Sequence, residues 1–238
     1  MIRFSIMTFL ALVMFLPTAQ AEEQYKAPVL YAGTATVFHD SKDLTAGDSL
    51  DGWDAFLLDP KVKKEEVWSV KDGVLVCKGQ PLGYLYTKEK YKNFRLTLQW
   101  RWAPGKEPGN SGVLMRITGN AISFMPKCVE AQLKTGRAGD IWAFYGYQLK
   151  GDPARIKKIE NHKTLGNFHG VSHVKSNEKE PGQWNTYEIT LDQGQLTVFV
   201  NGEKVNEAKD CDVVAGPIGL QAEGAEIHFR SIHLTELP

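Results

Sequence analysis

The stretch FRLTLQWRW at residues 94–102 constrains the fold of this 238-residue chain more than any other segment. Large apolar side chains alternate with polar ones over its whole length. A period of two is the pattern of a β-strand with one buried and one exposed face. No part of the chain after its first residues shows a comparable run of helical periodicity free of Gly, Asn, Asp and Pro. The segment therefore predicts a sheet with a strongly apolar face.

Turn residues separate further strand-like segments along the chain. The turn residues Asp72-Gly73 join a strand-like segment at 67–70 to one at 74–77. A turn at 192–194 joins the segment 187–191 to 196–200, and Asn201-Gly202 ends the second of these. Near the C-terminus we expect 218–221 to pair with 227–234. Many short strands at this spacing predict an all-β sandwich of two antiparallel sheets. The side chains expected in its core are Phe94, Trp100, Trp102, Ile189, Val198, Ile227 and Phe229.

Composition predicts a folded domain, and the N-terminal segment predicts that it is secreted. The chain is 42% hydrophobic and 11% aromatic, and its 28 basic residues equal its 28 acidic ones, which disfavours nucleic acid as a partner. Arg3, an apolar run at 4–17 and the A-x-A pattern Ala19-Gln20-Ala21 predict a signal peptide over residues 1–21, with export to the periplasm or outside. We therefore expect a single domain over residues 22–238 and no membrane span once the signal peptide is removed. The sequence does not indicate the oligomeric state.

Cysteine and histidine do not form a recognisable metal motif. Cys77, Cys128 and Cys211 are odd in number and lack C-x-x-C spacing, so at most one disulfide can form and a zinc site is disfavoured. His162, His169 and His173 lie in the polar stretch 150–181, which we expect to be a long surface excursion. That excursion either borders a site or is a solvated insertion without chemistry. No metal ligand is assigned.

Two neighbouring strand-like segments carry the candidate site. Period two places Arg116 on one face of 110–117, and it places Glu130, Gln132 and Lys134 on one face of 128–134. If the strands pair, these side chains share an open sheet surface. The alternative is an ordinary solvated face with cross-strand ion pairs. The aromatic residues that flank the patch are Trp142, Phe144, Tyr145 and Tyr147, which suit either a cleft or a core.

A second polar segment lies near the C-terminus. Gln221 and Glu223 share parity, and Gly224 lets Glu223 project past the sheet edge toward the same surface. Two carboxylates such as Glu130 and Glu223 suit acid/base chemistry at a glycosidic bond, although the sequence does not give their separation. A nucleophile elbow, a P-loop, a dinucleotide fingerprint and an HExxH motif are all absent from the sequence.

Eight motifs in order resemble the 3-keto-disaccharide hydrolase family over about residues 37 to 237. They are LDGW at 50–53, WSVKDGVL at 68–75, NFRLTLQWRW at 93–102, GNSGV at 109–113, EAQLK at 130–134 with Gly139-Asp140, GQWN at 182–185, Asn201-Gly202, and GPIGLQ at 216–221 with HFRSI at 228–232. The resemblance implies a concanavalin A-like jelly-roll sandwich that binds sugar on one sheet and, in characterised relatives, cleaves 3-keto-glycosides.

The chemistry of a 3-keto-glycoside, combined with the predicted strand faces, gives expected roles for single residues. Glu130 is the expected base that removes the C2 hydrogen, and Arg116 or Lys134 stabilises the enolate oxygen. The expected substrate-binding residues are Asn110, Gln132, Trp142, Gln221 and Glu223. No cofactor is assigned, and assistance by a divalent ion stays open. Two alternatives are a non-catalytic carbohydrate-binding module of the cell envelope and a structural or adhesion domain.

Overall fold

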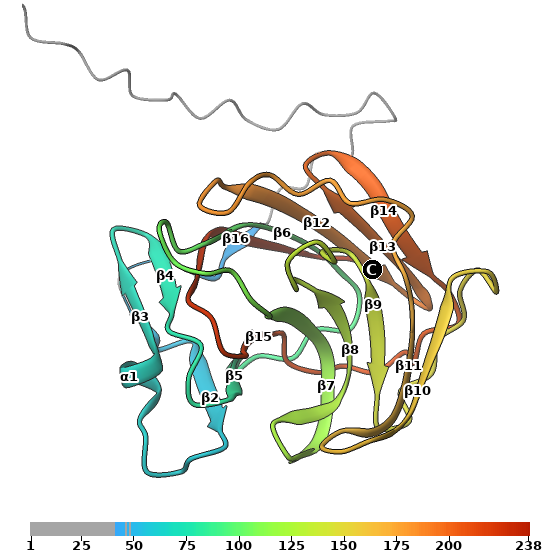
Figure 1. Ribbon diagram of the computed structural model, residues 1–238, viewed down its shortest axis with the longest axis horizontal. Helices are drawn as coiled ribbons and strands as arrows, with labels where there is room; N and C mark the ends of the chain where they lie inside the picture. Colours follow the sequence, from blue (N-terminus) through green and yellow to red (C-terminus); the bar gives the residue numbers. More distant parts are fainter. Residues whose placement is uncertain (1–40, 46, 48) are drawn as a thin grey trace, which may run out of the picture. The chain divides into compact units, whose positions relative to one another are not determined.

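The structure of the protein is a computed structural model that describes residues 41–45, 47 and 49–238 (Figure 1). Two antiparallel sheets account for most of it, as predicted, and the one helix in these residues is the single turn α1 (Lys64–Val67). The predicted signal peptide over 1–21 lies outside the described residues. Within them, no helix has the length and apolar character that crossing a membrane requires.

The first sheet has the strand order β14-β13-β12-β6-β16-β4-β3, and the short β1 adds to it by pairing with β16. The strands of this sheet are β1 (Lys42–Asp43), β3 (Trp68–Lys71), β4 (Val74–Cys77), β6 (Phe94–Trp102), β12 (Asn185–Asp192), β13 (Gln195–Val200), β14 (Glu203–Ala208) and β16 (Ile227–Glu236). The predicted β3–β4 and β12–β13 hairpins are both present.

The second sheet carries the candidate site and has the order β10-β11-β9-β8-β7-β15-β5-β2. Its strands are β2 (Trp53–Leu57), β5 (Gly83–Thr87), β7 (Gly112–Ile122), β8 (Met125–Gln132), β9 (Ile141–Phe144), β10 (Ile156–His162), β11 (Gly166–Val171) and β15 (Gly219–Ala222). Figure 1 shows β7, β8 and β9 side by side at the middle of this sheet.

The hydrophobic core lies between the two sheets. In β6, buried and half-buried residues alternate without exception, so Trp100 and Trp102 point into the core with ring centroids 6.2 Å apart. From the second sheet, Val113, Val129 and Ala131 join the same cluster. All seven side chains predicted for the core are buried. The opposite face of the second sheet, here called the outer face, is left available for a site.

Two predicted arrangements are wrong. Segment 218–221 does not pair with 227–234, because β15 lies between β7 and β5 in the second sheet while β16 lies between β6 and β4 in the first. The stretch 150–181 is not only a surface excursion, because β10 and β11 form a hairpin that extends the second sheet beyond β9. Apolar and polar residues alternate only weakly in this hairpin, because most of its side chains are exposed at the edge of the sheet.

The three cysteines are all buried and unpaired. Cys77 and Cys211 lie in the core between the sheets, and Cys128 lies under the outer face of the second sheet. Burial raises the pKa of the Cys77 thiol to about 12, so it behaves as a small apolar side chain rather than as a nucleophile.

Arg116 departs from the predicted position because a β-bulge interrupts β7. The pairing with β8 shifts by one residue between Met115 and Thr118, and Arg116 takes a φ of 51° there. An extra residue in one strand reverses the parity of all that follow it. Ile117 therefore lies on the outer face in place of Arg116.

The guanidinium of Arg116 is fully buried and holds three other segments together. It donates hydrogen bonds to the carbonyl oxygens of Lys92 (2.8 Å), Asp212 (2.6 Å) and Gln193 (2.8 Å). A fourth, longer bond of 3.3 Å reaches Asn93 Oδ1. The prediction that Arg116 shares an open surface with Glu130 is therefore wrong, and its planar fork stabilises the fold.

We expect Arg116→Lys to destabilise the protein. A lysine ammonium cannot reach three carbonyl groups in the directions that the guanidinium satisfies, and each lost charge-assisted hydrogen bond costs roughly 1.5–3 kcal/mol. Urea unfolding measures the change, with Arg95→Lys as a control because that side chain is partly exposed and forms a surface ion pair with Glu188. A variant as stable as the wild type would contradict this role.

Candidate active site

Cross-strand register divides the outer face into rows that run across the strands. In the central row, Glu130 of β8 lies between Leu114 of β7 and Trp142 of β9. In the row on one side, Gly112 of β7 pairs with Gln132 of β8. Gln221 of β15 lies on the other side of Gly112. This follows because the register of β15 against β7 is the same at the pair Gly219–Leu114 and at the bridge Asn110–Glu223. This row is called the polar row.

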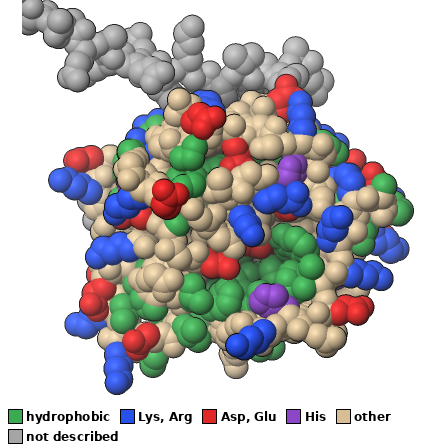
Figure 2. Space-filling model, viewed as in Figure 1, with side chains coloured by type: hydrophobic (Ala, Val, Ile, Leu, Met, Phe, Trp, Pro, Cys, Tyr) green, Lys and Arg blue, Asp and Glu red, His purple; other side chains and the backbone are tan. Residues whose placement is uncertain are grey.

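The row on the other side of Glu130 is apolar. Cys128 pairs with Phe144, and Phe144 pairs with Phe168 of β11. These three residues, here called the apolar row, belong to a second hydrophobic cluster that is separate from the core. Figure 2 shows a hollowed apolar surface bordered by acidic, basic and histidine side chains. Glu130 therefore lies at the boundary between a polar and an apolar half of the outer face.

The side chain of Glu130 occupies space that a glycine leaves open. A Cβ atom on Gly112 would lie 1.9 Å from Glu130 Oε1, so no other residue fits at position 112 without moving the carboxyl group. Only 2% of Glu130 is exposed to solvent. Gly170 leaves comparable space for the Trp142 ring, since a Cβ there would lie 2.7 Å from it.

Unpartnered oxygen atoms cluster around this carboxyl group. In the part of the chain that the structure describes, every buried side-chain oxygen without a hydrogen-bond partner belongs to Asn110, Glu130, Gln132 or Gln221. Buried polar groups are normally satisfied, because an unmet hydrogen bond costs about 1–3 kcal/mol. Four unmet acceptors at one place indicate a site for a ligand rich in hydroxyl donors.

The two carboxyl groups predicted as a pair influence each other. Burial, followed by the charges of Glu223 and Asp140, raises the pKa of Glu130 well above its ordinary value. Burial also raises the pKa of Glu223, while hydrogen bonds from Asn110 and Gln221 and the charge of Lys134 partly offset this rise. Raised carboxyl pKa values are typical of acid/base sites.

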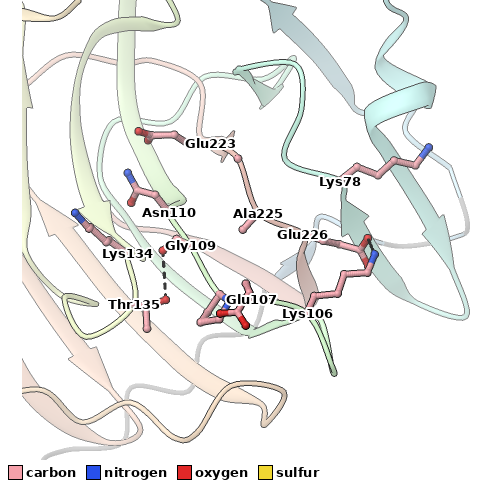
Figure 3. A pocket seen from close by; sticks show the side chains of 12 residues that line it. Lys78, Lys106, Glu107, Gly109, Asn110, Lys134, Thr135, Glu223, Ala225 and Glu226 are labelled. Carbon is pink, nitrogen blue, oxygen red and sulfur yellow. Dashed lines mark hydrogen bonds and ion pairs between the residues drawn. The ribbon is translucent and has the colours of Figure 1, made fainter. Parts of the chain in front are cut away.

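A cavity of about 740 Å³ adjoins the polar row (Figure 3). Asn110, Lys134 and Glu223 form one wall, where Figure 3 shows their polar ends close together on the same side. Lys106 and Glu226 form an ion pair on the opposite wall. Lys134 is exposed, and no carboxylate of the described residues lies within ion-pair distance of it. Of the lysines that line this cavity, Lys134 is the one on the wall with Asn110 and Glu223.

The predicted aromatic residues separate into two groups. Trp142 and Phe144 lie on the outer face, where each packs against Phe168 with ring centroids 5.4 Å and 5.0 Å apart. Tyr145 lies beside Phe144. Tyr147 instead lies in the core and donates its hydroxyl to the Asp212 carbonyl, so it does not line the site.

The histidines of 150–181 serve different purposes. His173 Nδ1 lies 2.6 Å from Asp140 Oδ1, and Arg137 contacts the other oxygen of that carboxylate, so this pair fastens the loop after β8. His162 lies at the rim of the outer face against Phe168, with ring centroids 5.8 Å apart. Among residues 41–238, apart from the undescribed positions 46 and 48, no three His, Cys, Asp or Glu side chains are grouped to bind a metal.

Of the predicted site residues, the structure brings together Asn110, Glu130, Gln132, Lys134, Trp142, Gln221 and Glu223. Arg116 alone is elsewhere. The sequence analysis missed Gly112, Phe168 and Gly170 as parts of the site. Gly112 belongs to the GNSGV motif, but only the register of β7 against β8 shows that Glu130 leans over it. Phe168 was missed because its hairpin was predicted as a surface excursion.

The raised pKa of Glu130 predicts that Glu130→Gln stabilises the protein at neutral pH. Between the ordinary pKa and the raised one, the unfolded chain loses this proton while the folded protein retains it. The wild-type free energy of unfolding therefore falls as pH rises through that window. A glutamine does not titrate, so the free energy of unfolding of the Glu130→Gln variant has no such dependence on pH. The difference in unfolding free energy between variant and wild type should therefore be near zero at about pH 4 and should grow toward about pH 8.

Thermal or urea unfolding at both pH values measures this difference. Glu160→Gln is the matched control, because Glu160 is an exposed glutamate on the edge strand β10 and belongs to neither the apolar nor the polar row. A Glu130→Gln advantage that stays constant over the pH range would contradict the assignment of a raised pKa to this carboxyl.

The fold is shared with solved structures of carbohydrate-active proteins. A putative glycosyl hydrolase from Parabacteroides distasonis is 24% identical with a TM-score of 0.57, and the match covers 83% of this chain and 100% of that one. The carbohydrate binding module CBM66 from Bacillus subtilis is 11% identical, with a TM-score of 0.57 and coverage of 78% and 96%. A lichenase derived from a mouse hindgut metagenome is 14% identical, with a TM-score of 0.50 and coverage of 83% and 98%.

At these identities the structures show the fold alone, a lectin- or glucanase-like jelly-roll sandwich. Among curated proteins, no sequence matches the chain. A family match, in contrast, spans residues 40–235 and includes every residue of the site and every strand except the last residue of β16. The chain belongs to the family described as the 3-keto-alpha-glucoside-1,2-lyase-like domain.

Proposed function

We propose that the protein cleaves 3-keto-glycosides by elimination and rehydration at the outer face of its second sheet. The observation that supports this most directly is the buried Glu130 carboxyl, whose Oε1 has no partner among the described residues and whose neighbours are three further unpartnered amide oxygens. A base needs a lone pair that no other group occupies, and a sugar needs acceptors for its hydroxyl groups. Both occur at one place.

The first step is proton abstraction. A ketone at C3 acidifies the hydrogen on C2, and the Glu130 carboxylate removes it. The electrons of the C2–H bond form the C2–C3 double bond of an enolate, and the negative charge moves to the oxygen on C3. The Lys134 ammonium, which has no carboxylate partner at ion-pair distance in the described residues, stabilises that oxygen.

The second step is expulsion of the C1 substituent. The enolate reforms the ketone at C3, a double bond forms between C1 and C2, and the C1–O bond breaks. The departing oxygen takes the proton that Glu130 has just received, which restores the Glu130 carboxylate. Water then adds across the double bond: Glu130 takes a proton from the water as its hydroxyl joins C1, and then delivers that proton to C2. The net reaction is hydrolysis.

Binding without turnover is the second candidate function, because the same unpartnered oxygens would hold an unreactive sugar. The buried Glu130 carboxyl favours catalysis over this alternative. A binding surface gains nothing from a buried carboxyl group without a hydrogen-bond partner for Oε1, whereas proton abstraction uses that lone pair. Incubation with methyl 3-keto-glucoside separates the two: release of methanol supports the enzyme, and saturable binding without release supports the module.

We expect Glu130→Gln to lower kcat/KM for methyl 3-keto-glucoside by about 10²- to 10⁴-fold, because the variant has no base. The wild-type rate should rise with pH through a limb above the ordinary glutamate pKa, since only the ionised carboxyl abstracts a proton. Steady-state kinetics over a pH series measure both effects, with Glu160→Gln as the control.

Two outcomes would remove Glu130 from this role. One is full activity in a folded Glu130→Gln protein. The other is a pH limb that persists unchanged in the residual activity of the variant.

Lys134→Met should lower kcat by about 10²- to 10³-fold, the usual cost of losing a group that stabilises an oxyanion. Lys134→Arg keeps a positive charge and should retain more of the rate. Lys158→Met is the matched control, because Lys158 is an exposed lysine on β10. Equal rates for the Met and Arg variants would show that the charge at position 134 does not matter.

A further inference from the structure

The outer face on the side of Glu130 away from the polar row is mostly apolar. Cys128 and Phe144 are buried, and Phe168 is half-buried. Few polar groups lie near it: the Tyr145 hydroxyl donates to the Ile122 carbonyl at 2.8 Å, His162 Nδ1 accepts the backbone N–H of Leu165 at 3.1 Å, and Tyr84 adds one hydroxyl to the same cluster. A second sugar ring there would replace only a few of the hydrogen bonds that it makes with water.

The aromatic side chains in this half are arranged for stacking. The Trp142 ring crosses the Phe168 ring at 69°, and Phe168 lies beside Phe144 at 31°. Ring centroids about 5 to 7 Å apart in edge-to-face or offset geometry are the arrangement that aromatic rings prefer. A further flat ring can join such a cluster by placing its face or edge against Trp142 and Phe168, which are both partly exposed.

The position of Glu130 limits what can occupy this half. Cys128 and Glu130 are two residues apart on β8, so the apolar row lies about 7 Å along the strand from the reacting carboxyl. The centres of two rings joined through one glycosidic oxygen are separated by a distance of that order. A sugar on the polar row with its C2 at Glu130 would therefore place the C1 substituent next to Trp142 and Phe168.

We propose that the aglycone which this site accepts is an aromatic ring rather than a second sugar. The inference rests on the proposed function, since it assigns the group that leaves C1 in that reaction. The keto sugar occupies the polar row, the scissile C1–O bond lies over the central row, and the aromatic aglycone packs on Trp142 and Phe168. The reaction then releases an aryl or arylalkyl alcohol.

The test compares three substrates with the purified protein: benzyl, methyl and glucosyl 3-keto-glucosides. Benzyl alcohol and methanol have similar acidity, so their rates differ through contacts with the aglycone rather than through leaving-group chemistry. We expect kcat/KM for the benzyl substrate to exceed the values for the other two by about tenfold or more, as burial of a ring of this size allows.

Phe168→Ala should reduce the ratio of benzyl to methyl kcat/KM toward one. Val174→Ala should keep the ratio, because Val174 is an exposed apolar residue that follows β11 outside the outer face. If Phe168→Ala does not fold by circular dichroism, Phe168→Leu provides the same comparison with less lost volume. A ratio unchanged in a folded Phe168 variant overturns the inference.

The outcomes separate this inference from the proposed function. Equal cleavage of all three substrates, or preference for the glucosyl one, overturns the aromatic aglycone and leaves keto-glycoside cleavage supported. Cleavage of none of them overturns the proposed function and the inference together.

Discussion

The inward side chains of the two sheets pack into one apolar layer, and this packing fixes the direction of the remaining side chains in the second sheet. Val129 and Ala131 are committed to the layer, so Cys128, Glu130 and Gln132 must point the other way. A shift of β8 by one residue would bury the polar set between the sheets. The site therefore derives its precision from the core, since the stability of the packing holds the carboxyl group in place.

Much of this arrangement was predictable from the sequence because period two is a local property. The alternation in 94–102 and the Asp72-Gly73 turn need no partner strand to be recognised, and both are present. Pairing is not local. β15 and β16 are neighbours along the chain, yet they lie in different sheets, and nothing within 218–234 indicates that the chain crosses between layers.

In the site, too, local alternation was predictable from the sequence and pairing between strands was not. Glu130 and Gln132 were placed on one face because no bulge interrupts β8 at that point, whereas Arg116 was misplaced because one residue with positive φ reverses the parity of β7. Asn110 and Glu223 lie beside each other through an isolated bridge whose register only the structure provides. The sequence thus predicted which side chains share a face better than it predicted their neighbours. Lys134 lies near Asn110 and Glu223, as predicted from its position just after the strand that carries Glu130 and Gln132.

Gly112 connects the backbone to the chemistry in a way that bears on how such domains diverge. The Glu130 carboxyl rests where the side chain of any other residue at 112 would begin. A chain of the same fold could keep Glu130 and every other polar group of the site, and still lose the geometry through one added methyl group on the neighbouring strand. The residue opposite Gln132 therefore decides whether a glutamate at position 130 can hold this position, and the two positions have to be considered together when related sequences are compared.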